Sequence, residues 1–406
     1  MIFKKLTNFK DAKKIFLNAI KPMESTEQVN IEDSMDRILA QDVIAPENVP
    51  HYRRATMDGY AVCAQDTIGA SVHSPVTLQI IPRSETMTPH SAVRVHTGSP
   101  IPEGADAVVM IEDTEKIGNT IDIYDQVHPW KNVGDIGEDI KKDSKILYSG
   151  QRLHPHDIAL LASLRIQKVQ VYKKPVVAII PTGEELVSRK TTKKLKPGSI
   201  IETNGLMTCL YIKKWGGIPI YHDIVSDVKE LIKEVITKYL SHDTVYPKVD
   251  MIILSGGTSV GKRDFVPEIV NSLGNILVHG INISPGKPTA LGMIDNIPVV
   301  CLPGYPVAAL VALFEFAKPA LWKLGRVPNI PDRVVYGILG DKIASKTGYY
   351  TYARVKYNPT NKIVTPVRVT GAGILSSVSQ SNGFVIIPEE VEGFNKGDEI
   401  EVVLID

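Results

Sequence analysis

Residues 250–264, DMIILSGGTSVGKRD, combine an apolar strand with a glycine-rich loop that leads into a predicted helix. Gly256, Gly261 and Lys262 fit the G-x-x-x-x-G-K pattern of a nucleotide-binding loop. Arg263 stands at the next position, where that motif requires a Ser or Thr hydroxyl to hold magnesium. The segment is therefore either an altered ATP site or a site for a different anion.

The glycines of this loop allow backbone N–H groups to approach an anion closely, and the N-terminus of the following helix adds partial positive charge. A tight strand-to-helix turn would explain a single glycine equally well. Several glycines with Ser255, Thr258 and Ser259 among them favour a phosphate cradle. Lys287, in the segment SPGKP, is a candidate counter-charge for a phosphate, although an isolated lysine is more often solvated.

Four carboxylates follow apolar strands of the same region: Glu184, Glu185, Asp227 and Asp264. A carboxylate beside a phosphate is repulsive unless a cation lies between them, so this pattern predicts a magnesium-bridged phosphate. In the simpler alternative, Asp227 caps the helix that follows it and the two glutamates are surface charges of a loop.

A second group of polar, glycine-containing segments lies earlier in the chain, at residues 53–62, 96–113 and 137–143. These segments are longer and more varied than turns alone require. An ordinary Asp-Gly turn would also explain Asp58, which precedes Gly59. The ten histidines show no metal-ligand spacing, so none is predicted to bind a metal.

Strands alternate with helices between residues 174 and 325, which predicts a βαβ series. Continuous apolar strands such as 251–254 suit a parallel sheet that is covered by helices on both faces and binds ligands beyond the carboxyl ends of its strands. Three loops are predicted at these ends: PTGEE at 181–185, SGGTSVG at 255–261 and PGYP at 303–306. We expect these loops to form one site.

The flanking segments predict other kinds of element. A helix is expected at residues 8–20 behind an Asn8 cap, and another is expected to begin near Pro155. Short apolar runs separated by Pro and Gly at 46–139 predict a β-rich module. Similar runs in the last part of the chain predict a small β-barrel or sandwich.

Composition excludes several classes of protein. The 406 residues suggest roughly three domains, and a formal net charge of +1 provides no global field for binding nucleic acid. Cys63, Cys209 and Cys301 are far apart, which fits a reducing compartment better than a disulfide framework. The charged N-terminus and the charges within the most apolar late segment predict a cytoplasmic protein that does not span a membrane.

These segments together resemble the MoeA/gephyrin-E family of molybdopterin molybdenumtransferases. The resemblance covers nearly the whole chain and rests on the motifs ATMDGYAV, HTGSPIPEGADAVVM, GEDI, PTGEEL, ETNG, SGGTSVGKRDF, SPGKPTALG and LPGYPVAAL. It implies a multidomain α/β plus β fold with a doubly wound, parallel-sheet, MogA-like central domain, an inserted β-rich domain and a small C-terminal β-barrel. The implied domains are 1–45 with 140–173 (N-terminal linker domain), 46–139 (β-rich), 174–326 (α/β, molybdopterin-binding) and 327–406 (barrel).

The resemblance also implies a reaction. Molybdate, or tungstate, would be inserted into adenylylated molybdopterin with Mg2+ present, and AMP would be released by a homodimer whose active site is shared between subunits. An adenylyltransferase could deliver the substrate. Matching positions imply these catalytic residues: Asp58, Thr97, Asp139, Glu185, Asp227 and Asp264, the last three also as metal ligands. The implied pterin and phosphate pocket consists of Gly256, Gly257, Ser259, Lys287, Pro303, Pro306, Ser376 and Ser377.

Three positions depart from the family pattern. Ser284 stands where the family usually has Lys, and GDIGEDI lacks the usual basic run before GEDI. Because each such contact is worth roughly 1.5 to 3 kcal/mol, weaker oxyanion binding or a preference for tungstate is a hypothesis, unless Arg54, Lys131 or Lys141 compensates. Tyr305 replaces the usual Asn of PGNP and could flank the pterin ring.

Three other functions stay open at this point. A molybdopterin adenylyltransferase would share the α/β domain, but the flanking modules argue against it. A non-catalytic scaffold would need a partner-binding groove, and a P-loop ATPase would need the missing hydroxyl at Arg263.

Overall fold

The computed structural model describes residues 6–241, 247–256 and 265–405. The chain divides into two compact units. The first, called the β-rich unit below, consists of residues 30–35 and 41–169. The second contains the other described residues and is called the α/β–barrel unit. No helix in these ranges is both long enough and apolar enough to span a membrane.

A six-stranded sheet with the order β7-β4-β6-β5-β9-β8 forms the centre of the β-rich unit. Its strands are β4 (Gly59–Val62), β5 (Val76–Ile80), β6 (Ser91–Val95), β7 (Ala107–Met110), β8 (Thr114–Ile117) and β9 (Thr120–Ile123). The side chains of Leu78, Val109 and Ile121 are buried in its core. The sequence-based prediction of a β-rich module is confirmed.

Shorter elements complete this unit. These are the pair β2 (Val43–Ile44) and β11 (Lys145–Leu147), the pair β3 (Arg54–Ala55) and β10 (Val133–Gly134), three 3-10 turns (Ile31–Asp33, Ala64–Thr67 and Ile111–Asp113) and α2 (Pro155–Ser163). The helix expected near Pro155 is confirmed. Its N-terminus is closed by Asp157, whose carboxylate accepts a hydrogen bond from the backbone amide of His154 at 2.8 Å.

The α/β domain is built on a sheet with the order β16-β13-β17-β21-β20-β18. Its elements are α1 (Phe9–Ala19), β13 (Val176–Pro181), α3 (Asn204–Lys214), β16 (Ile218–Tyr221), α4 (Lys229–Leu240), β17 (Met251–Ser255), α5 (Val266–Leu273), β18 (Asn275–His279), β20 (Ala290–Ile294), β21 (Ile297–Leu302), α6 (Pro306–Ala312), the π-helical turn η4 (Leu313–Ala317) and α7 (Lys318–Leu324). Strands β16, β13, β17 and β21 are parallel to one another. The pair β1 (Thr26–Asn30) and β12 (Lys168–Tyr172) precedes β13 in the chain.

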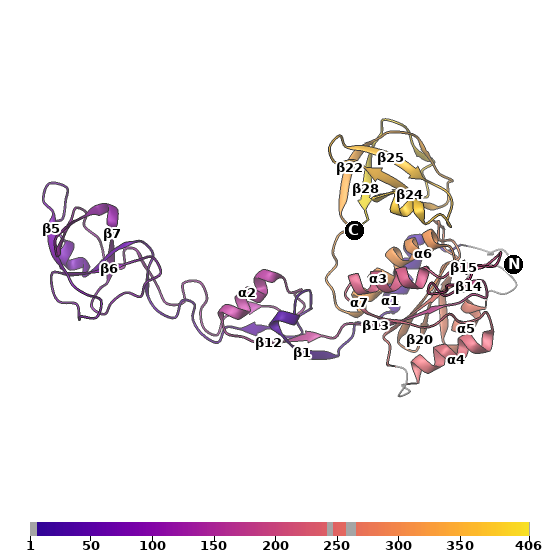
Figure 1. Ribbon diagram of the computed structural model, residues 1–406, viewed down its shortest axis with the longest axis horizontal. Coiled ribbons are helices and arrows are strands. Elements are labelled where there is room, and N and C mark those ends of the chain that lie inside the picture. Colours follow the sequence, from indigo (N-terminus) through magenta and orange to yellow (C-terminus); the bar gives the residue numbers. More distant parts are fainter. Residues whose placement is uncertain (1–5, 242–246, 257–264, 406) are drawn as a thin grey trace. The chain divides into compact units, whose positions relative to one another are not determined.

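Helices cover both faces of this sheet (Figure 1). One core joins the sheet to α1, α3, α6 and α7, for example through Phe16, Ile212 and Leu321. The other joins it to α4 and α5 through residues such as Ile236 and Ile269. Apolar strands buried on both faces explain why the sequence of this sheet is continuously hydrophobic, and the predicted doubly wound fold is confirmed.

Two details differ from the expectations. Strand β20 runs antiparallel to both of its neighbours, so one edge of the sheet is mixed. It forms a hairpin with β21 through Asp295, whose φ of 52° is the left-handed conformation that such a tight turn requires. In addition, α4 begins at Lys229 behind Val228, so the alternative in which Asp227 caps this helix is wrong.

The C-terminal strands close into a five-stranded barrel. They are β22 (Val334–Leu339), β24 (Tyr350–Tyr357), β25 (Ile363–Arg368), β26 (Gly383–Ile387) and β28 (Glu399–Leu404). The order β24-β25-β22-β28-β26 returns to β24 because β26 also pairs with β24. Of the two architectures expected from the sequence, the barrel is the one observed. The pair β23 (Ile343–Ala344) and β27 (Gly393–Phe394) and the short helix α8 (Ser376–Ser379) lie outside this closed sheet.

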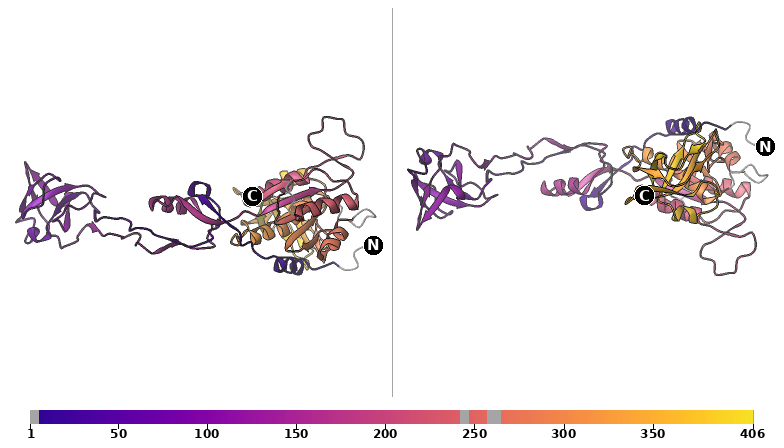
Figure 2. Two further views of the ribbon diagram at one scale, coloured as in Figure 1. Left: turned by 90° about the horizontal axis from the view of Figure 1, so that it is seen from below. Right: turned by 90° about the horizontal axis from the view of Figure 1, so that it is seen from above.

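The barrel is attached to the α/β domain by a strand and a helix. Strand β19 (Ile283–Ser284) pairs in parallel with β24 of the barrel. Helix α1, drawn in indigo in Figure 2, packs the ring of Phe9 against that of Tyr350 at 4.9 Å. The Glu389 carboxylate of the barrel accepts hydrogen bonds from the side-chain amides of Asn8, at 2.7 Å, and Asn282. These contacts fix the barrel to the α/β domain.

Candidate functional site

A cavity of about 310 Å3 lies at the carboxyl ends of β13, β17 and β21. This is where the strand order reverses between β13 and β17, the usual ligand position in such sheets. The sequence-predicted residues that line it are Glu185, Gly256 and Pro306. Thr182, Glu202, Asn204, Gly304 and Tyr305 also line it and come from the same three loops or from the start of α3.

Backbone hydrogen bonds hold these loops together. The backbone amide of Thr182 donates to the Ser255 carbonyl at 2.9 Å. The backbone amide of Gly256 donates to the Leu302 carbonyl at 3.3 Å. Gly256 has φ of 113°, and a Cβ atom there would lie 2.1 Å from the Thr182 carbonyl oxygen. Only glycine fits at the point where β17 enters the predicted cradle. Residues 257–264, which include Gly257, Ser259 and Asp264, lie outside the described residues.

Two of the predicted metal ligands are on neighbouring loops. Glu185 lines the cavity, and the backbone amide of the adjacent Glu184 donates to the Asp227 carboxylate at 3.3 Å. Within the described residues, no group of three or more His, Cys, Asp or Glu side chains could hold a metal ion. Mg2+ commonly takes only one or two protein carboxylates and completes its shell with water and phosphate oxygens. Of these two carboxylates, Glu185 lines the cavity, whereas Asp227 does not line it and is joined to the same loop through the Glu184 amide.

The buried carboxylate of Glu202 was missed by the sequence reasoning. Its side chain accepts hydrogen bonds from the Gly205 amide at the start of α3 and from the Tyr221 hydroxyl, the latter at 2.9 Å. Burial, together with this carboxylate, raises the pKa of Tyr221 well above its usual range. Asn204 donates to the Gly304 carbonyl at 2.8 Å and so ties α3 to the loop after β21. The motif ETNG, which contains both residues, was the available signal.

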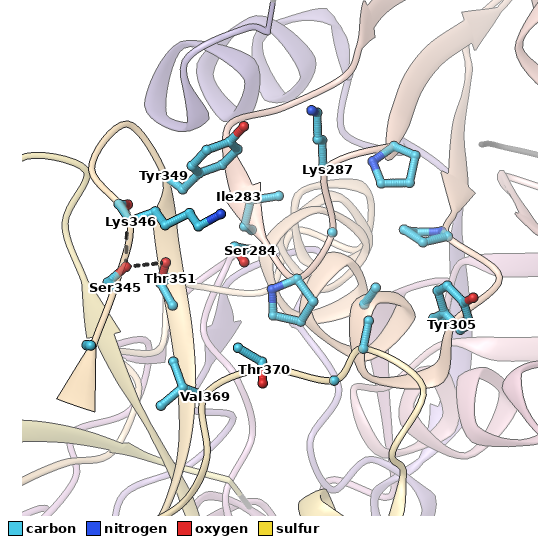
Figure 3. Close-up of a pocket in the computed structure, with 18 residues that line it drawn as sticks. Ile283, Ser284, Lys287, Tyr305, Ser345, Lys346, Tyr349, Thr351, Val369 and Thr370 are labelled. Atoms are coloured by element: carbon cyan, nitrogen blue, oxygen red, sulfur yellow. Dashed lines mark hydrogen bonds between the residues drawn. The ribbon is translucent and has the colours of Figure 1, made fainter. Parts of the chain in front are cut away.

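A larger cavity of about 710 Å3 lies between the α/β domain and the barrel (Figure 3). The predicted residues Lys287 and Pro303 line it, as do Ser284 and Tyr305. The barrel side contributes polar residues that the sequence reasoning did not identify: Ser345, Lys346, Tyr349, Thr351 and Thr370. Its volume lies within the range of about 300 to 1,000 Å3 that is typical of small-molecule sites.

Strand pairing sets the geometry of this larger cavity. Ser284 on β19 lies opposite Thr351 on β24, so the two side chains project from the same face. The Ser345 hydroxyl donates to the Thr351 hydroxyl oxygen at 2.7 Å. The backbone pairing of two distant parts of the chain therefore places three hydroxyl groups in one wall.

Tyr305 lines both cavities, and its side chain is 67% exposed. Gly373 lies against one side of the ring, because a Cβ atom at this glycine would be 3.2 Å from a ring carbon. The loop that contains Gly373 is held by Arg354, which is fully buried and donates hydrogen bonds to the carbonyls of Arg368 and Thr370. The wall between the two cavities is thus supported from inside the barrel.

In the β-rich unit, Asp58 and Thr97 are in direct contact. One Asp58 carboxylate oxygen accepts hydrogen bonds from the Thr97 backbone amide at 2.7 Å and from its hydroxyl at 2.9 Å. These two bonds lower the pKa of Asp58 below its ordinary value of 3.8. The His96 ring nitrogen lies 3.9 Å from the other carboxylate oxygen. The Asp58 carboxylate is therefore held ionised in one orientation.

The other predicted residues are placed as follows. Asp139 belongs to the β-rich unit, is exposed, and donates its backbone amide to the Val49 carbonyl at 3.0 Å. Ser376 is exposed, whereas Ser377 is buried and its hydroxyl donates to the Ile374 carbonyl at 2.6 Å. Their neighbours Gly373 and Leu375, not these serines, line the smaller cavity.

Three family profiles match the chain. The profile of the MoeA N-terminal region (domain I and II) matches residues 7–164, that of a probable molybdopterin binding domain matches 178–323, and that of the MoeA C-terminal region (domain IV) matches 336–405. The matches cover both units that the structure describes.

Similar proteins cover nearly the full chain. The chain is 33% identical to a molybdopterin molybdenumtransferase of Bacillus subtilis, over 94% of the chain and 90% of that protein. It is 32% identical to a molybdopterin molybdenumtransferase of Haemophilus influenzae, over 93% of each. The crystal structure of a molybdopterin biosynthesis moeA protein from Pyrococcus horikoshii has 33% identity and a TM-score of 0.82, over 99% of this chain and 100% of that one.

Proposed function

Because the chain belongs to the MoeA family and has an enzymatic role in molybdenum cofactor biosynthesis, we propose that it inserts molybdate into adenylylated molybdopterin and releases AMP. Two adjoining cavities support this reaction, because the charged residues that line one are acidic and those that line the other are basic. Among the described residues, the smaller cavity is lined by Glu185 and Glu202 without Lys or Arg, and the larger is lined by Lys287 and Lys346 without Asp or Glu. Tyr305 lines both cavities.

The smaller cavity would bind the phosphate groups of the nucleotide substrate. Glu185 and Asp227 would hold Mg2+ there, as would Asp264, which lies outside the described residues. When bound, Mg2+ would neutralise the phosphate charge that these carboxylates would otherwise repel. Gly256 lets the backbone of β17 come within reach of the phosphate, and Asn204 keeps the loop after β21 in place through its bond to Gly304.

The larger cavity would bind the oxyanion beside the pterin. Lys287 supplies positive charge from the α/β domain, and hydroxyl groups such as those of Ser284 and Thr351 can donate hydrogen bonds to the oxygens of a tetrahedral anion. The exposed ring of Tyr305 would lie against the flat pterin between the two anionic groups. This arrangement would keep the metal oxyanion close to the pyrophosphate bond that is cleaved when AMP is released.

The residues Asp58, Thr97 and Asp139 would act in a homodimer. They belong to the β-rich unit, whereas Glu185 and Lys287 belong to the other unit. We propose that the β-rich unit of one protomer completes the site of its partner. Mixing the inactive variants Asp58→Ala and Lys287→Ala should then restore part of the activity in mixed dimers, whereas sites built within single protomers would give no recovery.

An assay of AMP release tests the reaction itself. Purified protein with adenylylated molybdopterin and Mg2+ should release AMP when molybdate is added, and chelation of Mg2+ should stop the release. Pyrophosphate release from ATP and molybdopterin would instead support the adenylyltransferase alternative. Absence of molybdate-dependent AMP release from the wild type would support a non-catalytic scaffold.

A molybdopterin adenylyltransferase would pass the substrate to this enzyme, and a pull-down with that partner in the presence of the adenylylated product would test the transfer.

The reaction would take place in the cytoplasm, which is supported by free thiols at Cys63, Cys209 and Cys301. Cell fractionation would test this localisation.

A further inference from the structure

We propose that Lys346 of the barrel supplies the second cationic group for the oxyanion, opposite Lys287 of the α/β domain. This inference rests on the proposed function of the larger cavity and assigns a specificity-determining role to a residue of this chain. It follows from the charge of the cavity lining, from the direction of the Lys346 side chain, and from the strand pairing beside it.

The lining of this cavity favours anions. Its two charged residues are Lys287 and Lys346, and none of its described lining residues is Asp or Glu. Lys346 makes no ion pair with any residue in the described part of the chain. Figure 3 shows its side chain extending from the loop before β24 toward Ser284. Although Lys346 is exposed, its ammonium group can bind an anion in this cavity without competition from a carboxylate of the lining.

The neighbouring hydroxyl groups complete the binding surface. Ser284 and Thr351 lie opposite each other on β19 and β24, and Ser345 donates to Thr351 at 2.7 Å. Ser345 directly precedes Lys346, so the same loop orients the Thr351 hydroxyl and supplies one ammonium group. A tetrahedral dianion fits this set, since it offers several acceptor oxygens and two negative charges.

This arrangement also bears on Ser284. Ser284 has a short side chain and lies on β19, which pairs with β24. The longer Lys346 side chain extends toward Ser284 from the barrel (Figure 3). At this place the positive charge therefore comes from Lys346, in the loop before β24, and not from a residue of β19. Arg54, Lys131 and Lys141, the candidates for compensation considered from the sequence, belong to the β-rich unit and line neither cavity.

Equilibrium binding to the full chain tests the assignment. Molybdate, tungstate and AMP are titrated separately into the wild type and into Lys346→Met, Lys346→Arg and Lys342→Met. The last variant removes an exposed lysine of the same barrel that does not line the cavity. We expect Lys346→Met to bind both metal oxyanions about tenfold more weakly, while Lys346→Arg and Lys342→Met stay close to the wild type. Adding Ser284→Lys to Lys346→Met should recover most of the lost affinity.

The titration with AMP shows whether Lys346 binds a free oxyanion or a phosphate group of the substrate. Unchanged AMP affinity in Lys346→Met supports a site for the free oxyanion, whereas loss of AMP affinity alone would overturn the assignment. Wild-type affinity of Lys346→Met for molybdate and tungstate would also overturn it, while molybdate-dependent AMP release by the wild type would leave the proposed function intact. In steady-state assays, the variant should raise the KM for molybdate without lowering kcat.

Discussion

The Asp58 carboxylate accepts two hydrogen bonds from one residue, since the backbone amide and the hydroxyl of Thr97 both donate to the same oxygen, at 2.7 and 2.9 Å. These bonds favour the ionised carboxylate and lower its pKa below 3.8. The stability that they contribute is fully present above the ordinary carboxyl pKa and is lost as pH falls through the lower pKa of the folded state.

We therefore predict that Thr97→Val raises the pKa of Asp58 toward its ordinary value, because one of the two donors is removed. Carboxyl NMR of the labelled full chain, titrated from about pH 5 to about pH 2, measures this shift. Thr77→Val is the matched control, because the Thr77 hydroxyl donates to Asp122 at 2.6 Å on the same β-rich unit. It should leave the Asp58 pKa and AMP release unchanged, and an identical Asp58 titration in Thr97→Val would contradict the prediction.

The hydroxyl oxygen of Thr182 is buried and has no hydrogen-bond partner within the described part of the chain. A desolvated hydroxyl without a partner costs free energy, so Thr182→Val should stabilise the ligand-free protein by about 1 to 2 kcal/mol. Chemical denaturation measures the change. Thr208→Val serves as the comparison, since the buried Thr208 hydroxyl donates to the Asn204 carbonyl at 2.7 Å. That variant should be destabilised by about 1 kcal/mol, and destabilisation of both variants would show that Thr182 is already satisfied.

Gly256 and Gly304 line the same cavity but differ in the space around them. A Cβ at Gly256 would lie 2.1 Å from the Thr182 carbonyl oxygen, whereas a Cβ at Gly304 would meet no atom within 4 Å. Gly256→Ala should therefore lose about 2 to 4 kcal/mol of unfolding free energy and its AMP release. Gly304→Ala should stay within about 0.5 kcal/mol of the wild type. Similar melting temperatures for the two variants would show that β17 can shift without cost.

Local patterns explain how much of the fold was predictable. The Asn8 side chain accepts hydrogen bonds from the amides of Lys10 and Asp11, as its position before an amphipathic helix suggested. The apolar runs of β13, β17 and β21 predicted a parallel sheet because strands buried on both faces need no polar residues. The loops at their carboxyl ends followed from that topology alone, which is why Glu185, Gly256 and Pro306 could be placed in one cavity.

Non-local pairing explains what was missed. Strand β19 pairs with β24, so Ser284 lies opposite Thr351 although 67 positions separate them in the sequence (351 − 284). No periodicity or short motif encodes such a contact, so no sequence signal pointed to Lys346. Strand β20 was overlooked because its apolar run follows the glycine- and proline-rich segment SPGKP directly. The tight turn at Asp295 was the local signal for that hairpin.

Arg354 provides a test of whether the barrel shapes the larger cavity. Its guanidinium group is fully buried and donates to the carbonyls of Arg368, at 3.1 Å, and Thr370, at 2.6 Å. Arg354→Met fills a similar volume but leaves these carbonyls without a donor, so we expect a loss of about 2 to 4 kcal/mol. Hydrogen exchange should increase at residues 368–374, and molybdate should bind more weakly because Thr370 lines the cavity.

The exposed Arg333 of the same barrel is the matched control, and Arg333→Met should stay within about 0.5 kcal/mol of the wild type. Arg354→Lys separates charge from geometry, since a single ammonium group cannot donate to two carbonyls in the planar arrangement of a guanidinium. It should keep the charge yet recover only part of the stability. If Arg354→Met loses stability while exchange at 368–374 and molybdate affinity stay unchanged, the arginine stabilises the barrel alone and the wall of the cavity is held by α6, where the Val307 amide donates to the Ala372 carbonyl at 2.9 Å.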